Sequence, residues 1–204
     1  MKPKQIRLII ARLSANIGRS WAIVLLRFLS RKGAALARTR WAHSRSAEAA
    51  FLRRIALAPV LYEELGSKFG KQKALTVMED LLMAVGCSEQ WDHLKSMPGR
   101  QSEGMQRLMA FHDLMDLKGA PQFNLREYVQ QDDRVCHFVI TRCVFHDFFT
   151  EAGAPELTSS FCQVDRRFFP EAFPDFSFHR GDSWENTIAY GKDHCEFVFE
   201  KKEI

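Results

Sequence analysis

Several motifs that would identify a common catalytic or cofactor-binding class are missing from the 204-residue sequence. It has no Gly-x-Gly-x-x-Gly or P-loop pattern, which argues against a nucleotide cofactor, and no Gly-x-Ser-x-Gly elbow of a serine hydrolase. Its five cysteines include no Cys-x-x-Cys pair, and no apolar run approaches the ~20 residues that a membrane span requires. The absence of long apolar runs excludes a polytopic membrane protein.

The cysteines indicate reduced thiols rather than a disulfide framework. Their number is odd, and no secretory signal with a cleavage site is recognisable. Because disulfides persist mainly in oxidising compartments, we expect a cytoplasmic protein whose thiols are core residues, nucleophiles or metal ligands. The five are Cys87, Cys136, Cys143, Cys162 and Cys195.

Acidic residues are almost absent from the first quarter of the chain. Residues 1–54 carry 13 Lys or Arg and one acid, Glu48, whereas residues 55–204 carry 16 Lys or Arg and 24 Asp or Glu. The formal net charge of +4 therefore combines a basic head of +12 with a body of −8. An acidic body argues against a nucleic-acid-binding main domain, so we expect no nucleic-acid partner.

The basic head contains an amphipathic helical pattern flanked by arginines. Its apolar stripe, with spacings of three or four residues, consists of Ile10, Leu13, Ile17, Trp21, Val24 and Phe28. Such a helix is typical of a peripheral contact with the anionic inner face of a membrane, of an organelle transit peptide, or of a helix that packs on its own domain or on a second subunit of a homo-oligomer. We divide the chain into a basic helical extension, residues 1–46, and a main domain, residues 47–204.

Periodicity and turn signals predict helices first and strands afterwards. The expected helices cover 47–58 with an interruption at Pro59, then 60–69, 72–85 with Gly86 as the C-cap, 105–117 and 142–152. A loop is expected at 89–104, and strands at 123–129, 135–141, 176–179 and 196–200, the first two as a hairpin. This order predicts an α+β fold in which N-terminal helices pack on a small antiparallel sheet with a β-β-α-β-β C-terminal half.

The last third of the chain is rich in residues that can carry chemistry. Cys162 and Asp165 are three positions apart, so one turn of helix would place the thiol and the carboxyl on one face. A thiol can act as a nucleophile with a carboxylate as proton acceptor, but the carboxylate also raises the pKa of the thiol, so a nearby cation is needed. The candidate cations are Arg166, Arg167, Arg180 and His146.

Two other interpretations of these cysteines stay open. A buried free cysteine is common in hydrophobic cores, so each can be a packing residue. Cys143-x-x-His146 and His194-Cys195 offer zinc ligands, although the paired spacing of a structural zinc site is missing. We expect no cofactor, with zinc as the alternative.

A set of motifs in the C-terminal half is more specific than any single cysteine. The set consists of Cys143 in a predicted helix, Gly153-Ala154-Pro155-Glu156-Leu157, Phe161-Cys162-Gln163-Val164-Asp165, and Thr187-Ile188-Ala189-Tyr190-Gly191 followed by Cys195-Glu196-Phe197. Leu61-Tyr62-Glu63-Glu64-Leu65 and Phe69-Gly70 precede them. Together they resemble the bacterial L-2-amino-thiazoline-4-carboxylic acid hydrolase family over about 140 residues, Leu61 to Phe199, and leave the basic head uncovered.

This resemblance implies a hydrolase that opens a small 2-aminothiazoline-carboxylate-like ring by breaking a C–N or C–S bond. Attack on such a ring requires a nucleophile, either Cys162 or water activated by Asp165, so we expect Cys162 and Asp165 to be the catalytic pair. The small-molecule substrate would be bound by Cys143, His146, Glu156, Arg180, Trp184, Thr187 and Cys195.

Two positions depart from the family pattern. Trp184 stands where the family tends to have Arg, and Glu196 stands where it usually has Asp. A weaker likeness of the ending, from Gly191 to Phe197, to 4-vinyl-reductase-type domains gives the alternative function. In that case the chain is a non-catalytic small-molecule-binding or sensory module, attached to a membrane or a partner by its N-terminus.

Overall fold

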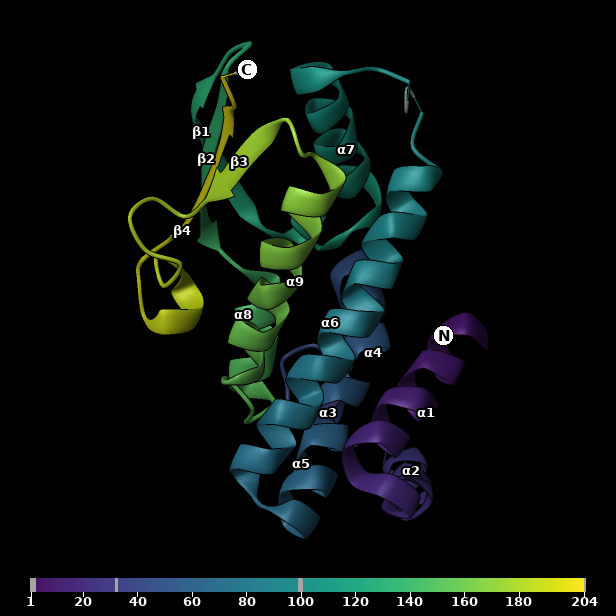
Figure 1. The fold of residues 1–204 in the computed structure, drawn as a ribbon. Coiled ribbons are helices and arrows are strands. Elements are labelled where there is room, and N and C mark those ends of the chain that lie inside the picture. Colours follow the sequence, from purple (N-terminus) through teal and green to yellow (C-terminus); the bar gives the residue numbers. More distant parts are fainter. Residues whose placement is uncertain (1–2, 32, 99–100, 204) are drawn as a thin grey trace. The chain divides into compact units, whose positions relative to one another are not determined.

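The computed structural model describes residues 3–31, 33–98 and 101–203, which fall into two units (Figure 1). The first unit comprises the described residues of Met1–Gly86 together with Phe148–Phe161, and it is helical. The second comprises those of Cys87–Asp147 and Cys162–Ile204, and it contains the sheet. Helices in the N-terminal half and a small antiparallel sheet in the C-terminal half confirm the predicted α+β class.

The N-terminal helices belong to the first unit. They are α1 (Pro3–Ile17), α2 (Trp21–Ser30), α3 (Ala34–Ala37), α4 (Ala47–Ile55) and α5 (Leu57–Phe69), with the 3-10 turn η1 (Gly18–Ser20) between α1 and α2. The predicted interruption near Pro59 is confirmed, since α4 ends and α5 begins just before it. Three further helices, α6 (Lys71–Lys95), α8 (Val144–Glu151) and α9 (Leu157–Ala172), have residues in both units.

The part of the basic head that carries the stripe forms two helices, α1 and α2, not the single helix that the stripe predicts. Gly18, with a φ of +54°, turns the chain between α1 and α2, a conformation that glycine adopts at little cost. The predicted stripe is nevertheless the inward face, because Leu13, Val24 and Phe28 are buried and α2 packs against α5. This burial favours the interpretation of a helix that packs on its own domain. That residues 1–46 are separable stays a prediction.

The same segment is more apolar than the sequence analysis expected. By length and composition alone, Pro3–Leu29 passes as one helical stretch able to cross a membrane, which is weak evidence so close to the N-terminus. Its turn at Gly18 leaves 15 residues in α1 and 10 in α2. At ~1.5 Å per residue, neither helix spans the ~30 Å hydrocarbon core of a bilayer.

Helix α6 corrects two predictions. It continues through Gly86 to Lys95, so Gly86 is not a C-cap and residues 89–95 are not a loop. A glycine inside a helix costs ~1 kcal/mol relative to alanine. Beyond it, however, Trp91 and Leu94 pack into the core of the second unit, and this burial outweighs the local cost.

The sheet of the second unit has four described strands. They are β1 (Leu125–Gln131), β2 (Val135–Arg142), β3 (Phe176–His179) and β4 (Cys195–Lys201), all antiparallel in the order β1-β2-β4-β3. Asp132 accepts hydrogen bonds from the backbone N–H groups of Arg134 and Val135, which forms the predicted hairpin turn. Two helices, α8 and α9, connect β2 to β3 where the sequence predicted one, because the helical pattern of 157–172 was not assigned.

Aromatic side chains fill the inner face of this sheet. Phe138 pairs with Phe197 across β2 and β4, and Phe178 pairs with Phe199 across β3 and β4. Helix α7 (Gly104–Lys118) and the second-unit part of α9 cover this face with further rings, including Phe111, Phe168 and Phe169. The many phenylalanines are therefore buried bulk that carries no polar group to satisfy.

One imidazole, that of His112, lies within this aromatic core. Its ring contacts those of Phe138, Phe169 and Phe199, and neither ring nitrogen has a hydrogen-bond partner among the described residues. Burial, assisted by the positive charge of Arg126, lowers the pKa of His112 to about 3. The ring is therefore neutral in the folded protein at neutral pH.

We predict that His112 makes the fold sensitive to acid. Between pH 6.5 and about 3 the unfolded chain binds a proton at His112 that the folded chain does not, so its contribution to stability falls as the pH falls. The His112→Phe variant should lose this pH dependence, which amounts to up to ~1.4 kcal/mol in the free energy of unfolding per pH unit. Urea unfolding of both proteins across this range measures it, and a constant difference between them would contradict the prediction.

Candidate functional site

A stripe along one side of helix α9 includes a thiol, a carboxyl group and a guanidinium group. Asp165 and Arg166 follow Cys162 by three and four residues, and Pro170 follows Arg166 by four, so these side chains share one side of the helix. Leu157, Val164 and Phe168 are buried on the rest of its surface. Cys162 and Asp165 thus lie one helical turn apart.

Arg180, which follows β3, joins this stripe to the sheet. Its side chain is 1% exposed, and its Nη2 donates to Asp165 Oδ2 at 3.0 Å. The Nη1 atom donates to the backbone carbonyl of Glu196 at 3.2 Å, and the guanidinium carbon lies 4.1 Å from the centre of the Phe197 ring. The aromatic sheet face and the β4 backbone therefore hold the cation against the carboxyl group.

The carboxyl group of Asp165 has an unusual environment. Burial raises its pKa to about 6, although the charge and the hydrogen bond of Arg180 oppose this rise. The side chain is still 25% exposed, so protons can reach it. A carboxyl group with this pKa is ionised in most molecules at neutral pH and can accept a proton during a reaction.

Two thiols, those of Cys162 and Cys195, lie within electrostatic range of this ion pair, and a third, that of Cys143, lies within range of both of these thiols. Burial raises the pKa of the Cys162 thiol far above its ordinary value, Arg180 lowers it, and Asp165 and the other two thiols raise it further. Of the four cations that the sequence offered for Cys162, Arg180 is therefore the one that opposes the rise.

The other two thiols have backbone N–H groups directed at their sulfur atoms. Burial raises the pKa of Cys143 to about 11, while the N–H groups of His146 and Phe145, at the start of α8, oppose the rise. Burial also raises the pKa of Cys195, whose sulfur accepts a hydrogen bond from the N–H of Ile188 at 3.2 Å. All three thiols are thus neutral in the resting protein at neutral pH.

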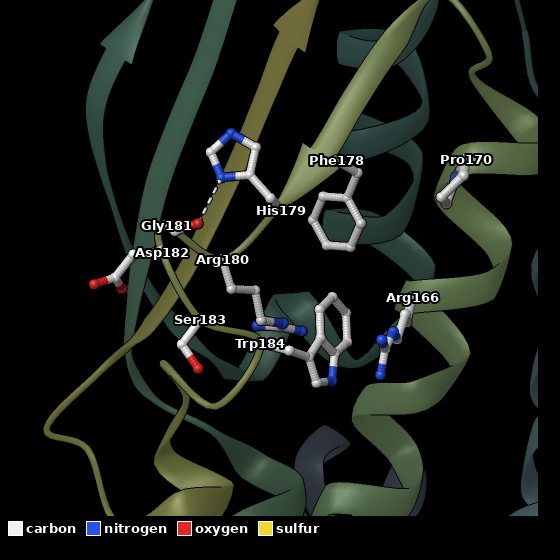
Figure 2. Close-up of a pocket in the computed structure, with 9 residues that line it drawn as sticks. All are labelled: Arg166, Pro170, Phe178, His179, Arg180, Gly181, Asp182, Ser183 and Trp184. Carbon is white, nitrogen blue, oxygen red and sulfur yellow. Dashed lines mark hydrogen bonds between the residues drawn. The ribbon is translucent and has the colours of Figure 1, made fainter.

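A pocket of about 440 Å³ opens beside Arg180 (Figure 2). Figure 2 shows the Trp184 ring between the side chains of Arg180 and Arg166. The two guanidinium carbons lie 4.7 Å and 5.3 Å from its centre, respectively. Two buried donors in this region, Arg180 Nε and Trp184 Nε1, have no hydrogen-bond partner in the described part of the chain. Such donors suit a ligand with acceptor atoms.

The remaining predicted substrate-binding residues, Thr187, His146 and Glu156, have other surroundings. The side chain of Thr187 is fully buried, and its hydroxyl and the Nδ1 atom of His146 are buried without a partner among the described residues. Glu156 belongs to the first unit, where it accepts a hydrogen bond from the Tyr62 hydroxyl at 2.7 Å. The substrate-binding roles of all three stay predictions.

Sequence reasoning missed the aromatic contacts of the site. Phe178 and Phe197 flank Arg180, and the only signal for them was the alternation of phenylalanines along their strands. It also missed that Glu196 accepts hydrogen bonds from His137 and His194. Burial raises the pKa of Glu196, but these two hydrogen bonds outweigh it and hold the pKa below its ordinary value.

The cysteine and histidine side chains do not form a metal site in the structure as described. Over residues 3–31, 33–98 and 101–203, no group of three or more His, Cys, Asp or Glu side chains is placed to hold a metal ion. The zinc alternative, with Cys143, His146, His194 and Cys195 as ligands, gains no support from this geometry.

The fold and the site define an α+β protein in which Arg180 lines a small-molecule-sized pocket and pairs with Asp165 within electrostatic range of the Cys162 thiol. Cys162 and Asp165 themselves are not among the residues that line this pocket. The family model described as L-2-amino-thiazoline-4-carboxylic acid hydrolase matches residues 48–199. The chain belongs to this family. Comparisons with curated proteins and with solved structures found no match.

We predict that Arg180 and Asp165 are coupled in stability. Arg180→Met leaves a largely buried carboxyl group without its cation and should lower the free energy of unfolding by about 3 kcal/mol. Asp165→Asn should cost less in the Arg180→Met background than in the wild type, because its partner is already gone. Urea unfolding of the four proteins gives the coupling energy, which we expect to exceed ~1 kcal/mol.

The matched control is Arg167→Met, on helix α9, which also carries Asp165. Arg167 forms an exposed ion pair with Glu171 at 3.4 Å, so its loss should cost ~0.5 kcal/mol or less. If Arg180→Met and Arg167→Met lower the free energy of unfolding equally, the buried ion pair stabilises the fold no more than the exposed one.

Proposed function

We propose that this chain hydrolyses a small heterocyclic carboxylate of the 2-aminothiazoline type. The observation that carries the proposal is the ion pair of Arg180 and Asp165, which lies within interaction range of the Cys162 thiol and beside a pocket. All of these residues fall within the stretch that the family model matches. The family description supports hydrolysis in general, and the residues support the particular roles given below.

The pocket suits a planar anionic substrate. A volume of about 440 Å³ lies within the usual range for small-molecule sites and is ample for one small ring. Trp184 offers an aromatic surface for such a ring, and Arg166, exposed at the pocket wall, offers a bidentate partner for a carboxylate. Arg166 thereby replaces the arginine that this family tends to have at the position of Trp184.

The reaction requires attack on the ring carbon between nitrogen and sulfur. The Cys162 thiol forms the new S–C bond while its proton passes to the Asp165 carboxylate and the C=N π electrons move onto the ring nitrogen. Breakage of a ring C–S or C–N bond then returns this proton from Asp165 to the leaving atom. Water next adds to the carbon held by Cys162, with Asp165 again accepting a proton. As the Cys162–carbon bond breaks, the C=N bond re-forms and Asp165 returns its proton to the sulfur atom, which restores the thiol and the carboxylate. The net change is the addition of one water.

Two features of the site support this division of roles. Because burial raises the pKa of Cys162, the thiolate exists only as the proton leaves, and Asp165, with a pKa of about 6, is ionised and ready to accept it. The fixed positive charge of Arg180 stabilises negative charge as it forms on sulfur, without rearrangement during the reaction.

We predict that Cys162→Ser lowers turnover of 2-aminothiazoline-4-carboxylate at least about a thousandfold, because it removes the nucleophile. Mass spectrometry measures formation of a product heavier by one water, and a thiol reagent shows whether the C–S bond breaks. Cys136→Ser is the matched control, since Cys136 is a buried core thiol beside Met109. It should lower thermal stability more than Cys162→Ser does, yet retain activity within about twofold.

The two catalytic roles can fail separately. Full activity in Cys162→Ser combined with an inactive Asp165→Asn would mean that Asp165 activates water directly. Full activity in both variants would place the reaction elsewhere in the protein.

We predict that kcat/KM rises with pH through about 6, because Asp165 must lose its proton to act as the base. Below that pH the rate should fall about tenfold per unit, which corresponds to one proton. A pH–rate profile of the wild-type protein measures this. A flat profile between pH 5 and 7, for a protein that remains folded, would contradict the role given to Asp165.

A second candidate function is the small-molecule-binding or sensory module. Two observations favour it: the thiols are all neutral at rest, and Trp184 occupies the position where the family tends to have arginine. Titration calorimetry with 2-aminothiazoline-4-carboxylate tests it. Saturable binding in the absence of any product would favour the module over the enzyme.

A further inference from the structure

Helix α2 is apolar on both of its sides. Eight of its ten residues are apolar, and the inward side, with Val24 and Phe28, is buried in the first unit. The outward side presents Ile23, Leu26 and Leu29, which are 54%, 70% and 53% exposed. These three residues are spaced three apart, so they form one continuous apolar face.

Such a face is unusual on a short helix. A helix that is apolar all around is normally buried on all sides, because each exposed leucine or isoleucine gains ~1.5–3 kcal/mol from full burial. On helix α1, the side chain of Ile6 is also 42% exposed. We therefore expect a binding partner to cover this outer face, since no described residue of the chain covers it.

The charge of the segment identifies the kind of partner. Residues 3–31 contain six Lys or Arg and no acid. Arg12 and Arg31 are paired with acids of the same unit, whereas Arg7 and Arg19 are exposed and have no ion pair among the described residues. A second copy of this chain would bring two acid-free faces together, which like-charge repulsion opposes. An anionic surface is attracted instead.

We propose that the outer face of α2 docks onto an anionic lipid bilayer, with α2 lying in the plane of the interface. Ile23, Leu26 and Leu29 would enter the boundary between headgroups and acyl chains, while Arg7 and Arg19 contact lipid phosphates. The turn at Gly18 fits a helix that lies on the membrane rather than one that crosses it. This proposal does not depend on the hydrolase reaction.

The test is co-sedimentation of the full chain with vesicles. We compare pure phosphatidylcholine with phosphatidylcholine that contains about one third phosphatidylglycerol, at low and at high salt. The wild-type protein should bind the anionic vesicles at least about tenfold more tightly than the neutral ones, and salt should weaken this binding. The double variant Ile23→Ser/Leu26→Ser should lower binding at least about tenfold, because the apolar contact is lost.

Charge and apolar contact are separated by further variants. Arg7→Glu/Arg19→Glu should also weaken binding at least about tenfold at low salt. The matched controls lie outside the head: Leu117→Ser/Val129→Ser, which removes exposed apolar residues, and Lys73→Glu/Lys118→Glu, which reverses exposed charges. Both controls should bind as the wild type does. Far-UV circular dichroism and the melting temperature verify that each variant is folded.

Three results would overturn the proposal. Equal binding to neutral and anionic vesicles would show that binding is not electrostatic. Unchanged binding of Ile23→Ser/Leu26→Ser would show that the outer face of α2 does not contact the membrane. A halved molecular mass of that variant in light scattering, with no vesicle binding by the wild type, would identify a second copy of the chain as the true partner.

Discussion

The buried guanidinium group of Arg180 is the constraint on which the polar chemistry of the second unit depends. An arginine that is 1% exposed is costly unless its donors are used, and here its Nη1 and Nη2 atoms bind the backbone of β4 and a carboxyl group. The cation in turn keeps Asp165 from being neutralised further, and it is the main charge that opposes the rise in the pKa of Cys162. Burial raises the pKa of both the acid and the thiol, and this one side chain opposes both rises.

The aromatic core explains how such a cation can be held inside the unit. Phe178, Trp184 and Phe197 present ring faces to Arg180, which partly replace the water that the charge has lost. The same rings belong to the sheet and to the loop that follows it, so the strand pairing positions them. Packing and chemistry therefore use the same residues, and a change in strand register would displace the cation as well as the core.

The sequence predicted those features that local patterns determine. Strand β3 has the predicted bounds because alternating phenylalanines mark its buried face, and the spacing of Cys162 and Asp165 suited the helix that contains them. The continuation of α6 past Gly86 was not predictable in this way, because distant residues of the second unit bury Trp91 and Leu94. The choice of Arg180 among four candidate cations likewise depends on how β3 and β4 pair. The turn at Gly18 was not predictable either, because the apolar spacing of three and four residues continues without a break from α1 into α2.

Protonation of Asp165 has two opposite effects on the site. When the carboxyl group is protonated, Arg180 loses its internal counter-ion, and the positive charge beside the pocket is more available to an anionic ligand. When the carboxyl group is ionised, that charge is partly neutralised, but the proton acceptor that the proposed reaction requires is present. In the proposed reaction, ligand affinity and the rate of the chemical step would therefore change in opposite directions as the solution becomes more acidic. The best working pH of such a site is a compromise, set by the strength of one buried ion pair.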